Sequence, residues 1–414
     1  MSKTLASLSS LHRLWRLLPV RQRRKLAVCG TALLAPRPDA CPPPGRGGLV
    51  LAGEVDRPSG LGESARVMRQ ALARLGVPVV TFDVGVPWDR APGGASVTEV
   101  PDGAPLLLHV NAPLVPWALR RLPRALVRGR RIVGYWAWEL PVVPESWRVG
   151  LPFVHEIWAP SSFTADALRP FADGRPVRVV PHALALVPPL PSALDRAAFG
   201  LPAEALLVLV SFSLASSFER KNPLAAVAAF RAAFGDRADR LLLLKIGNPG
   251  HFPADFDRLR AAVAGAPNIR IETRTLPMAD SHALTACADI VLSLHRSEGF
   301  GLVPAEAMLL GRAVVATGWS GNMDFMDPAS AALVRPRLVE ARDPRGVFEA
   351  PGAVWANPDP EEAALHLRRL ADDPEVRGAL GARGREMARR CLGAGKLIEA
   401  VARLGLPAAG EHAS

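Results

Sequence analysis

Glu298 and Glu306 stand in the stretch SEGFGLVPAEAM (297–308), separated by seven residues that include a Gly-x-Gly bend and a proline. A strand is predicted to end at His295, and a helix to begin at Pro304, because a proline in the first helical position forfeits no hydrogen bond. Glu298 is therefore expected on a loop at the carboxyl end of a strand, and Glu306 in the first turn of the helix.

The N–H groups at that helix start attract phosphate, whereas a carboxylate beside them repels phosphate and suits a neutral diol, either ribose or a hexose. The combination predicts a site for a phosphate flanked by two sugars, as in a nucleotide-sugar. The alternative is a helix-capping glutamate next to a solvated loop glutamate.

Arg220 and Lys221 form a basic pair in SSFERKNP, directly before Asn222-Pro223, which is expected to open a helix. A nucleoside diphosphate that leaves a sugar gathers negative charge, and lysine and arginine can stabilise that charge in a dry cleft. The pair is a candidate for this task. The alternative is a solvated basic pair at a helix start.

Short apolar runs alternate with helical patterns along most of the chain, which predicts parallel sheets covered on both faces. Strands are expected at 48–55, 77–84, 105–110, 131–138, 154–160 and 177–182, then at 205–213, 240–247, 268–273, 289–295 and 312–317. A proline-rich stretch, 186–202, has the character of a hinge. We predict an α/β protein with a tail and linker (1–47), two doubly wound Rossmann-like domains (48–190 and 191–400) facing across a cleft, and a C-terminal tail (401–414).

The stretch DIVLSLHRSEGFGLVPAEAMLLGRAVVATGWSGN (289–322) resembles the signature of the family 4 retaining glycosyltransferases, and the resemblance extends at varying strength over roughly residues 48–400. It implies the GT-B fold and a reaction without metal or other cofactor. By this resemblance Glu298 contacts the donor sugar and Glu306 holds the nucleotide ribose. Further donor contacts are expected from Phe300, Gly301, Leu302, Val303, Ser320, Gly321 and Asn322.

Two departures from the family pattern affect the candidate catalytic residues. The family usually has another arginine just after the first strand of the second domain, but Ser211, Phe212 or Ser213 stands there, which leaves Arg220 to take over its task. Many members also have a histidine near the end of the strand at 131–138. Glu139 occupies that region here and is a candidate for binding or deprotonating a hydroxyl.

Gly60 and Gly62 lie in a G-x-G-x-x-A pattern that Asp83 follows at about the distance of a dinucleotide-binding fingerprint. In such a fingerprint the first glycine follows the strand at once, whereas EVDRPS intervenes here. The longer loop suits the glycine-rich loop of the resembling family, which approaches the donor diphosphate across the cleft.

Aromatic side chains gather in GYWAWELPVVPESW (134–147), where Trp136 and Trp138 flank the approach to Glu139. Aromatic faces stack on sugar rings, so both are candidates for acceptor binding, together with His109 and Asn111. Packing in the core is the equally open alternative for the tryptophans.

The chain's formal charge of +11 is concentrated at its start. Residues 1–46 carry nine basic side chains against Asp39, a net +8, which leaves +3 for the other 368 residues. A nucleic-acid-binding body is therefore not expected. We predict that residues 1–35 form a basic amphipathic segment that rests on the anionic inner face of the cell membrane. The alternatives are a solvated tail and an export signal. The four cysteines form no metal or disulfide pattern and fit the cytoplasm.

Together these observations predict a retaining, metal-independent transferase that moves a hexose of the mannose or glucose type from a GDP- or UDP-linked donor. The acceptor is expected to be a glycan or a lipid-linked molecule in cell-surface polysaccharide biosynthesis. The alternatives are a catalytically idle GT-B module that binds glycans or partners, and an NAD(P)-dependent enzyme.

Overall fold

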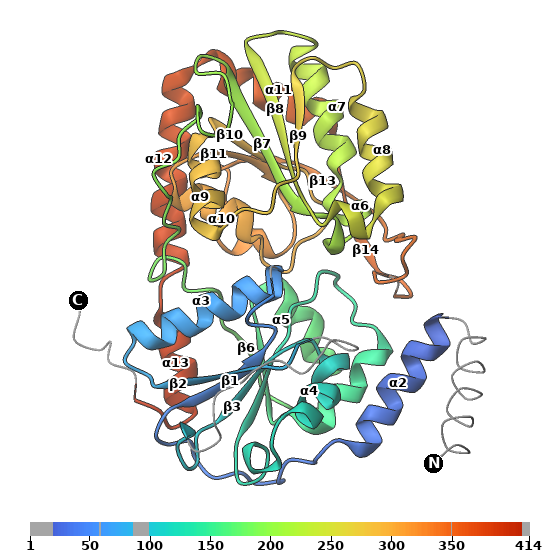
Figure 1. The fold of residues 1–414 in the computed structure, drawn as a ribbon, viewed down its shortest axis with the longest axis vertical. Helices are drawn as coiled ribbons and strands as arrows, with labels where there is room; N and C mark the ends of the chain where they lie inside the picture. Colours follow the sequence, from blue (N-terminus) through green and yellow to red (C-terminus); the bar gives the residue numbers. More distant parts are fainter. Residues whose placement is uncertain (1–19, 58, 86–98, 349, 408–414) are drawn as a thin grey trace, which may run out of the picture.

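The computed structural model describes residues 20–57, 59–85, 99–348 and 350–407 (Figure 1). It contains two six-stranded parallel sheets, each in its own domain, stacked along the long axis of the molecule. This confirms the prediction of two doubly wound domains. The first 19 residues of the predicted tail and residues 408–414 lie outside the described part of the chain.

The sheet of the first domain has the strand order β2-β1-β3-β4-β5-β6. Its strands are β1 Leu49–Gly53, β2 Val79–Asp83, β3 Leu106–His109, β4 Ile132–Tyr135, β5 Glu156–Ala159 and β6 Val177–Val179. The central strands β1, β3, β4 and β5 are buried along their whole length. Their continuous apolar runs are what a parallel sheet covered on both faces requires.

Helices cover both faces of this sheet: α2 Val20–Leu34, α3 Gly60–Arg74, α4 Val115–Arg121 and α5 Ser162–Leu168, with 3-10 turns that include η4 Glu145–Phe153. The N-terminal α2 lies beside α4 on the outside of the domain (Figure 1).

The sheet of the second domain has the order β12-β11-β10-β7-β8-β9. Its strands are β7 Leu206–Ser213, β8 Arg240–Gly247, β9 Ile269–Glu272, β10 Ile290–Ser293, β11 Ala313–Thr317 and β12 Ala332–Val334. Its helices are α6 Phe218–Lys221, α7 Pro223–Phe234, α8 Pro253–Val263, α9 Met278–Cys287, α10 Leu302–Leu309, α11 Pro360–Asp372 and α12 Pro374–Cys391.

An antiparallel hairpin, β13 Pro336–Glu340 and β14 Val354–Pro358, extends from the second domain and was not predicted. Most of β13 is exposed, so its sequence lacks the apolar run by which the other strands were recognised. The loop between its strands lies on the side of the second domain that faces the first (Figure 1).

The end of the chain returns to the first domain. Helix α13, Gly395–Arg403, follows α12 and lies with the strands of the first domain (Figure 1). The N–H of Gly45 donates to the carbonyl of Leu404 at 2.7 Å, and Ala185 N–H donates to the carbonyl of Leu392 at 2.9 Å. The final helix, although it lies largely within the range predicted for the second domain, therefore ties the two domains together.

Candidate active site between the two domains

Arg220 is fixed by the short helix α6 and by the turns on either side of it. Ser217, at φ +72°, caps the helix by accepting a hydrogen bond from the N–H of Arg220 at 3.3 Å. Asn222 ends it in the left-handed conformation and donates to the carbonyl of Leu294 at 3.0 Å, which holds α6 against the end of β10. The guanidinium of Arg220 is buried and donates to the carbonyl of Ser297 at 2.8 Å.

Glu298 lies at the centre of a buried charge cluster. Its carboxylate accepts a hydrogen bond from Nη1 of Arg220 at 3.2 Å and another from Nζ of Lys221. Burial opposes ionisation of Glu298, but the charges of Lys221 and Arg220 outweigh it and hold the pKa at about 2. Glu298 is therefore ionised at neutral pH, and the structure brings it together with Arg220 and Lys221.

Glu139 joins this cluster from the first domain. One carboxylate oxygen lies 3.8 Å from Nη2 of Arg220, and the backbone carbonyl of Glu139 accepts a hydrogen bond from the hydroxyl of Ser297. Burial raises the pKa of Glu139, and Arg220 partly offsets that rise. A carboxyl with a raised pKa next to an ionised one is suited to proton transfer.

The loop after β11 supports the loop that carries Glu298. Ser320, at φ +80°, accepts a hydrogen bond on its hydroxyl from the N–H of Glu298 at 2.8 Å. The N–H of Gly321 donates to the carbonyl of Glu298 at 2.9 Å, and a Cβ on Gly321 would lie 2.4 Å from the carbonyl oxygen of Gly299. Asn322 is fully buried and bonds His295 at 3.0 Å. Ser320, Gly321 and Asn322 thus fix the conformation of the loop that carries Glu298. Their contact with a donor remains a prediction.

Helix α10 begins earlier than the sequence suggested. Gly301, at φ +101°, is its N-cap, and Leu302 and Val303 are its first residues, so Pro304 is the third helical residue rather than the first. Glu306 consequently lies in the second turn, which corrects its expected position. The free N–H groups at the helix start belong to Leu302 and Val303, two of the predicted donor contacts.

Glu306 lies apart from the charge cluster and pairs with a histidine that sequence reasoning did not single out. Its Oε1 is 3.6 Å from Nε2 of His282 on α9, an ion-pair distance rather than a hydrogen bond. Burial raises the pKa of Glu306. Burial opposes protonation of His282, but Glu306 outweighs it and raises the pKa of the imidazole. The negative charge of Glu63, at the start of α3, also reaches Glu306 from the first domain.

Two hydroxyl side chains of the first domain contact the segment from Ser297 to Glu306, the candidate donor loop, directly. Ser161, the N-cap of α5, donates to the carbonyl of Gly299 at 2.6 Å. The hydroxyl of Thr164 lies 3.3 Å from the same carbonyl oxygen and also donates to the carbonyl of Trp138, in its own domain, at 2.7 Å. The N–H of Ser162 donates to a carboxylate oxygen of Asp324 at 2.7 Å. Because serine and threonine at a helix start also serve as ordinary caps, the sequence carried no signal for this role.

The predicted acceptor residues lie mainly in the core of the first domain. His109 is fully buried, stacks on Tyr135 with ring centroids 4.4 Å apart and contacts the Ser64 hydroxyl at 2.9 Å. Burial lowers the pKa of His109 to about 4. Asn111 accepts a hydrogen bond from the N–H of Ala137 at 2.9 Å.

Trp136 and Trp138 are both buried and pack edge to face on Trp147. Trp136 packs within the core of the first domain, whereas Trp138 also stacks on Phe348 of the second domain. Phe300 likewise packs edge to face on His182, at 4.5 Å, across the domain boundary.

At the start of α3, the glycine pattern lets the loop before the helix pack closely against it. A Cβ on Gly62 would lie 2.2 Å from the carbonyl oxygen of Arg57, whereas Gly60 has open space around it. The carboxylate of Asp83 accepts hydrogen bonds from the N–H groups of Asp56 and Gly85. These bonds give the carboxylate of Asp83 a local structural role, with one N–H donor on each of its two oxygens.

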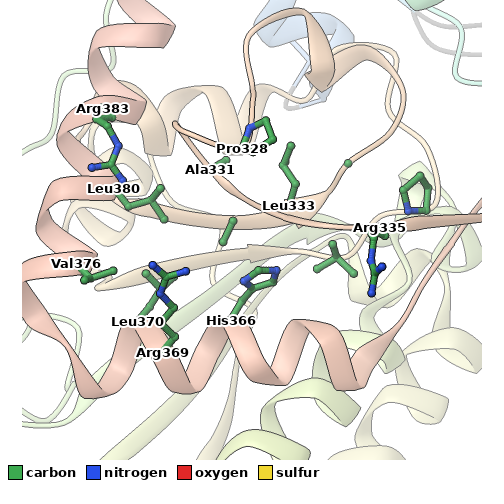
Figure 2. A pocket seen from close by; sticks show the side chains of 14 residues that line it. Pro328, Ala331, Leu333, Arg335, His366, Arg369, Leu370, Val376, Leu380 and Arg383 are labelled. Atoms are coloured by element: carbon green, nitrogen blue, oxygen red, sulfur yellow. The ribbon is translucent and has the colours of Figure 1, made fainter.

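A cavity of about 390 Å³ lies elsewhere, on the second domain, between the loop at β12 and the helices α11 and α12 (Figure 2). Its lining includes Arg335, Arg369, Arg383 and His366 together with apolar side chains such as Leu333 and Leu380. No predicted site residue lines it. The chemistry-bearing side chains gather at the domain boundary instead, so we place the candidate site there. Among the described residues no group of three or more His, Cys, Asp or Glu side chains could hold a metal ion.

Residues 208–373 match the family model described as glycosyl transferases group 1. Two D-inositol 3-phosphate glycosyltransferases are similar in sequence. That of Kineococcus radiotolerans is 30% identical over 237 residues, which cover 54% of this chain and 49% of the relative. That of Saccharomonospora viridis is 29% identical over 201 residues, covering 48% and 42%. The chain thus matches somewhat less than half the length of these relatives.

Solved structures share the fold over nearly their whole length. Sucrose-phosphate synthase from Thermosynechococcus elongatus superposes with a TM-score of 0.63 at 19% identity, covering 87% of this chain and 98% of that one. HepE from Anabaena, in complex with UDP and glucose, gives 0.57 at 15% identity, covering 86% and 99%. These likenesses identify the fold as GT-B.

Proposed function

Because the chain belongs to the glycosyl transferases group 1 family and has the GT-B fold, we propose that it transfers a sugar from a nucleotide-sugar to an acceptor. The observation that carries the proposal is the buried cluster of Glu298, Arg220, Lys221 and Glu139 at the meeting of the two domains. Bringing two cations and two carboxylates out of water in one place costs free energy of folding. Clusters of this kind, with shifted pKa values, gather at functional sites.

In the proposed reaction, Lys221 and Arg220 stabilise the charge that develops on the departing diphosphate. Arg220 is buried and the Lys221 side chain is 19% exposed, so water screens their charges less than it does at an open surface. Glu298, kept ionised by the same two cations, orients the sugar through its hydroxyls. Retention of the anomeric configuration by displacement on one face, without a metal, is what the family resemblance implies.

At the other end of the donor loop, Glu306 with His282 is proposed to hold the ribose. An ionised carboxylate accepts hydrogen bonds from two neighbouring hydroxyls, and His282 favours this form because it opposes the rise that burial causes in the pKa of Glu306. Gly301, Leu302 and Val303 are proposed to present their N–H groups to the diphosphate between the two glutamates. Gly60 and Gly62 on the opposing helix start complete this part of the site.

The donor is proposed to be a UDP- or GDP-linked hexose. The UDP and glucose bound by the structurally similar HepE favour uridine and glucose among these. The acceptor is proposed to be a glycan or lipid-linked molecule of cell-surface polysaccharide biosynthesis. The similar fold of WaaG, a glycosyltransferase involved in lipopolysaccharide biosynthesis, supports this choice (TM-score 0.54, 15% identity).

A panel of UDP-, GDP-, ADP- and dTDP-sugars, with EDTA present, tests the donor by thermal shift. A ligand at 100 times its Kd adds about 2.7 kcal/mol to the free energy of unfolding. One nucleotide-sugar is expected to stabilise the wild type and to lose its effect in Glu306→Ala, but not in the control Glu340→Ala, whose side chain is exposed on β13. If none stabilises the protein, the idle-module alternative is favoured.

We further propose peripheral contact with the cytoplasmic face of the membrane through residues 1–35. No helix in the described ranges is long and apolar enough to cross a bilayer. Helix α2 ends in Leu33 and Leu34, whose side chains are 83% and 67% exposed. Replacing both with Asn is expected to weaken binding to anionic vesicles in a sedimentation assay. Leu365→Asn, at an exposed leucine of the second domain, is the control, and equal sedimentation of all three proteins would contradict the proposal.

A further inference from the structure

The loop between β13 and β14 carries Phe348 from the edge of the second domain into the charge cluster. Phe348 is only 5% exposed. Its ring stacks on Trp138 of the first domain, with centroids 5.5 Å apart and planes inclined by 25°. The guanidinium carbon of Arg220 lies 5.1 Å from the centroid of the same ring. Phe348 thus contacts a proposed catalytic cation and the opposite domain at once.

The loop is anchored to the turn that begins α6. Asp343, with 2% of its surface exposed, accepts hydrogen bonds from the N–H groups of Val347 at 3.0 Å and Phe348 at 3.2 Å. Its other oxygen accepts from the hydroxyl of Ser217 at 3.3 Å, and Ser217 is the residue that caps α6. One buried carboxylate therefore fixes Phe348 relative to the backbone of Arg220.

Arg345 provides a second anchor. Its Nη1 donates to the carbonyl of Leu214 at 2.6 Å, and its Nη2 pairs with Asp255. The guanidinium also lies over the ring of Phe252, 3.8 Å from the centroid. With contacts to the turn before α6 and to the start of α8, the loop is a fixed wall of the site rather than a free extension.

We propose that Phe348 is a positioning residue for Arg220, which it holds in the geometry needed to meet the departing diphosphate. An aromatic face attracts a guanidinium and limits the planes in which it can lie. Because the ring of Phe348 also stacks on Trp138 of the first domain, Phe348 holds Arg220 fully in place only while the first domain packs against the second. The inference rests on the proposed transferase function and adds to it a residue outside the donor loop.

Three single variants test this role. Phe348→Leu keeps the apolar bulk but removes the ring face, so kcat is expected to fall about tenfold, equivalent to about 1.4 kcal/mol, while the KM for the donor changes little. Phe348→Tyr keeps the aromatic ring face and is expected to retain the kcat of the wild type. Val347→Ala changes the adjacent exposed side chain and is the control.

A double variant separates positioning from general loss of structure. If Phe348 acts through Arg220, then Phe348→Leu causes no further loss of kcat in an Arg220→Lys background, because the shorter ammonium no longer lies against the ring. Independent, multiplicative losses in the double variant would overturn the proposal.

Hydrogen exchange gives a readout that does not depend on catalysis. The amides of residues 214–222 are expected to exchange faster in Phe348→Leu than in the wild type or in Val347→Ala. Unchanged exchange would overturn the inference whether or not a donor has been found. A wild type that turns over no nucleotide-sugar, but shows the expected exchange, would instead contradict the proposed function alone.

Discussion

The ammonium of Lys221 and the carboxylate of Glu298 form an ion pair in the charge cluster at the boundary between the two domains, and Arg220 contacts the same carboxylate. Lys221 and Arg220, which are proposed to stabilise the leaving diphosphate, are therefore already paired with the carboxylate of Glu298. A diphosphate that enters must share these cations with Glu298, which ties donor binding to the charge on that one side chain.

Removing the two charges of this pair is expected to have opposite effects on product binding. Lys221→Met removes a cation, so kcat should fall about 10²- to 10³-fold and the nucleoside diphosphate should bind more weakly. Glu298→Gln frees both cations from their counter-charge, so kcat should fall while the nucleoside diphosphate binds more tightly. Calorimetric titration with UDP and GDP, beside turnover of the identified donor, measures both. Weaker binding in Glu298→Gln would contradict the shared-cation account.

Acid should destabilise the protein through Glu298. Its pKa is depressed from 4.5 to about 2 in the folded state, so its ionised form contributes stability above pH 4.5 that is lost as the pH falls toward 2. Glu298→Gln has no such group and should lose less of its melting temperature than the wild type over that window. Melting curves collected across the window, with Glu340→Gln as the control, provide the measurement. Parallel curves for all three proteins would show that Glu298 is not held ionised.

His282 should stabilise the fold more in mildly acidic than in alkaline solution. Its pKa is raised above 6.5 by Glu306, so the contribution of the charged pair is complete below 6.5 and disappears as the pH rises through the raised value. Urea denaturation of the wild type and His282→Gln is expected to show a larger difference in unfolding free energy near pH 6 than near pH 9. A difference independent of pH would assign His282 to packing alone.

Gly62→Ala and Gly60→Ala should differ although both glycines lie in the first turn of α3. A Cβ at position 62 meets the backbone carbonyl of Arg57 at 2.2 Å, so the loop must shift, at a cost of about 1–3 kcal/mol in unfolding free energy. Position 60 is open, and alanine there is expected to be neutral or slightly stabilising. Chemical denaturation of the two variants measures the two changes in unfolding free energy. Equal changes would show that the loop containing Arg57 shifts without cost.

The sequence alone determined the parts of this protein that depend on local pattern. Short apolar runs such as Leu206–Ser213 suit strands of a parallel sheet that is covered on both faces, and their alternation with helices favours two doubly wound domains. The candidate donor loop was also evident in sequence, because Glu298 and Glu306 flank a glycine bend whose backbone can turn at φ +101°.

Only the tertiary structure decided which side chains meet. Glu139 and Arg220 are 81 positions apart, and no periodicity relates them, yet their charged groups approach to 3.8 Å. The same is true of Phe348, which follows the largely exposed strand β13 but packs against both Arg220 and Trp138. Such contacts depend on how two separately folded domains and one loop pack together, which is a property of three-dimensional shape and not of sequence spacing.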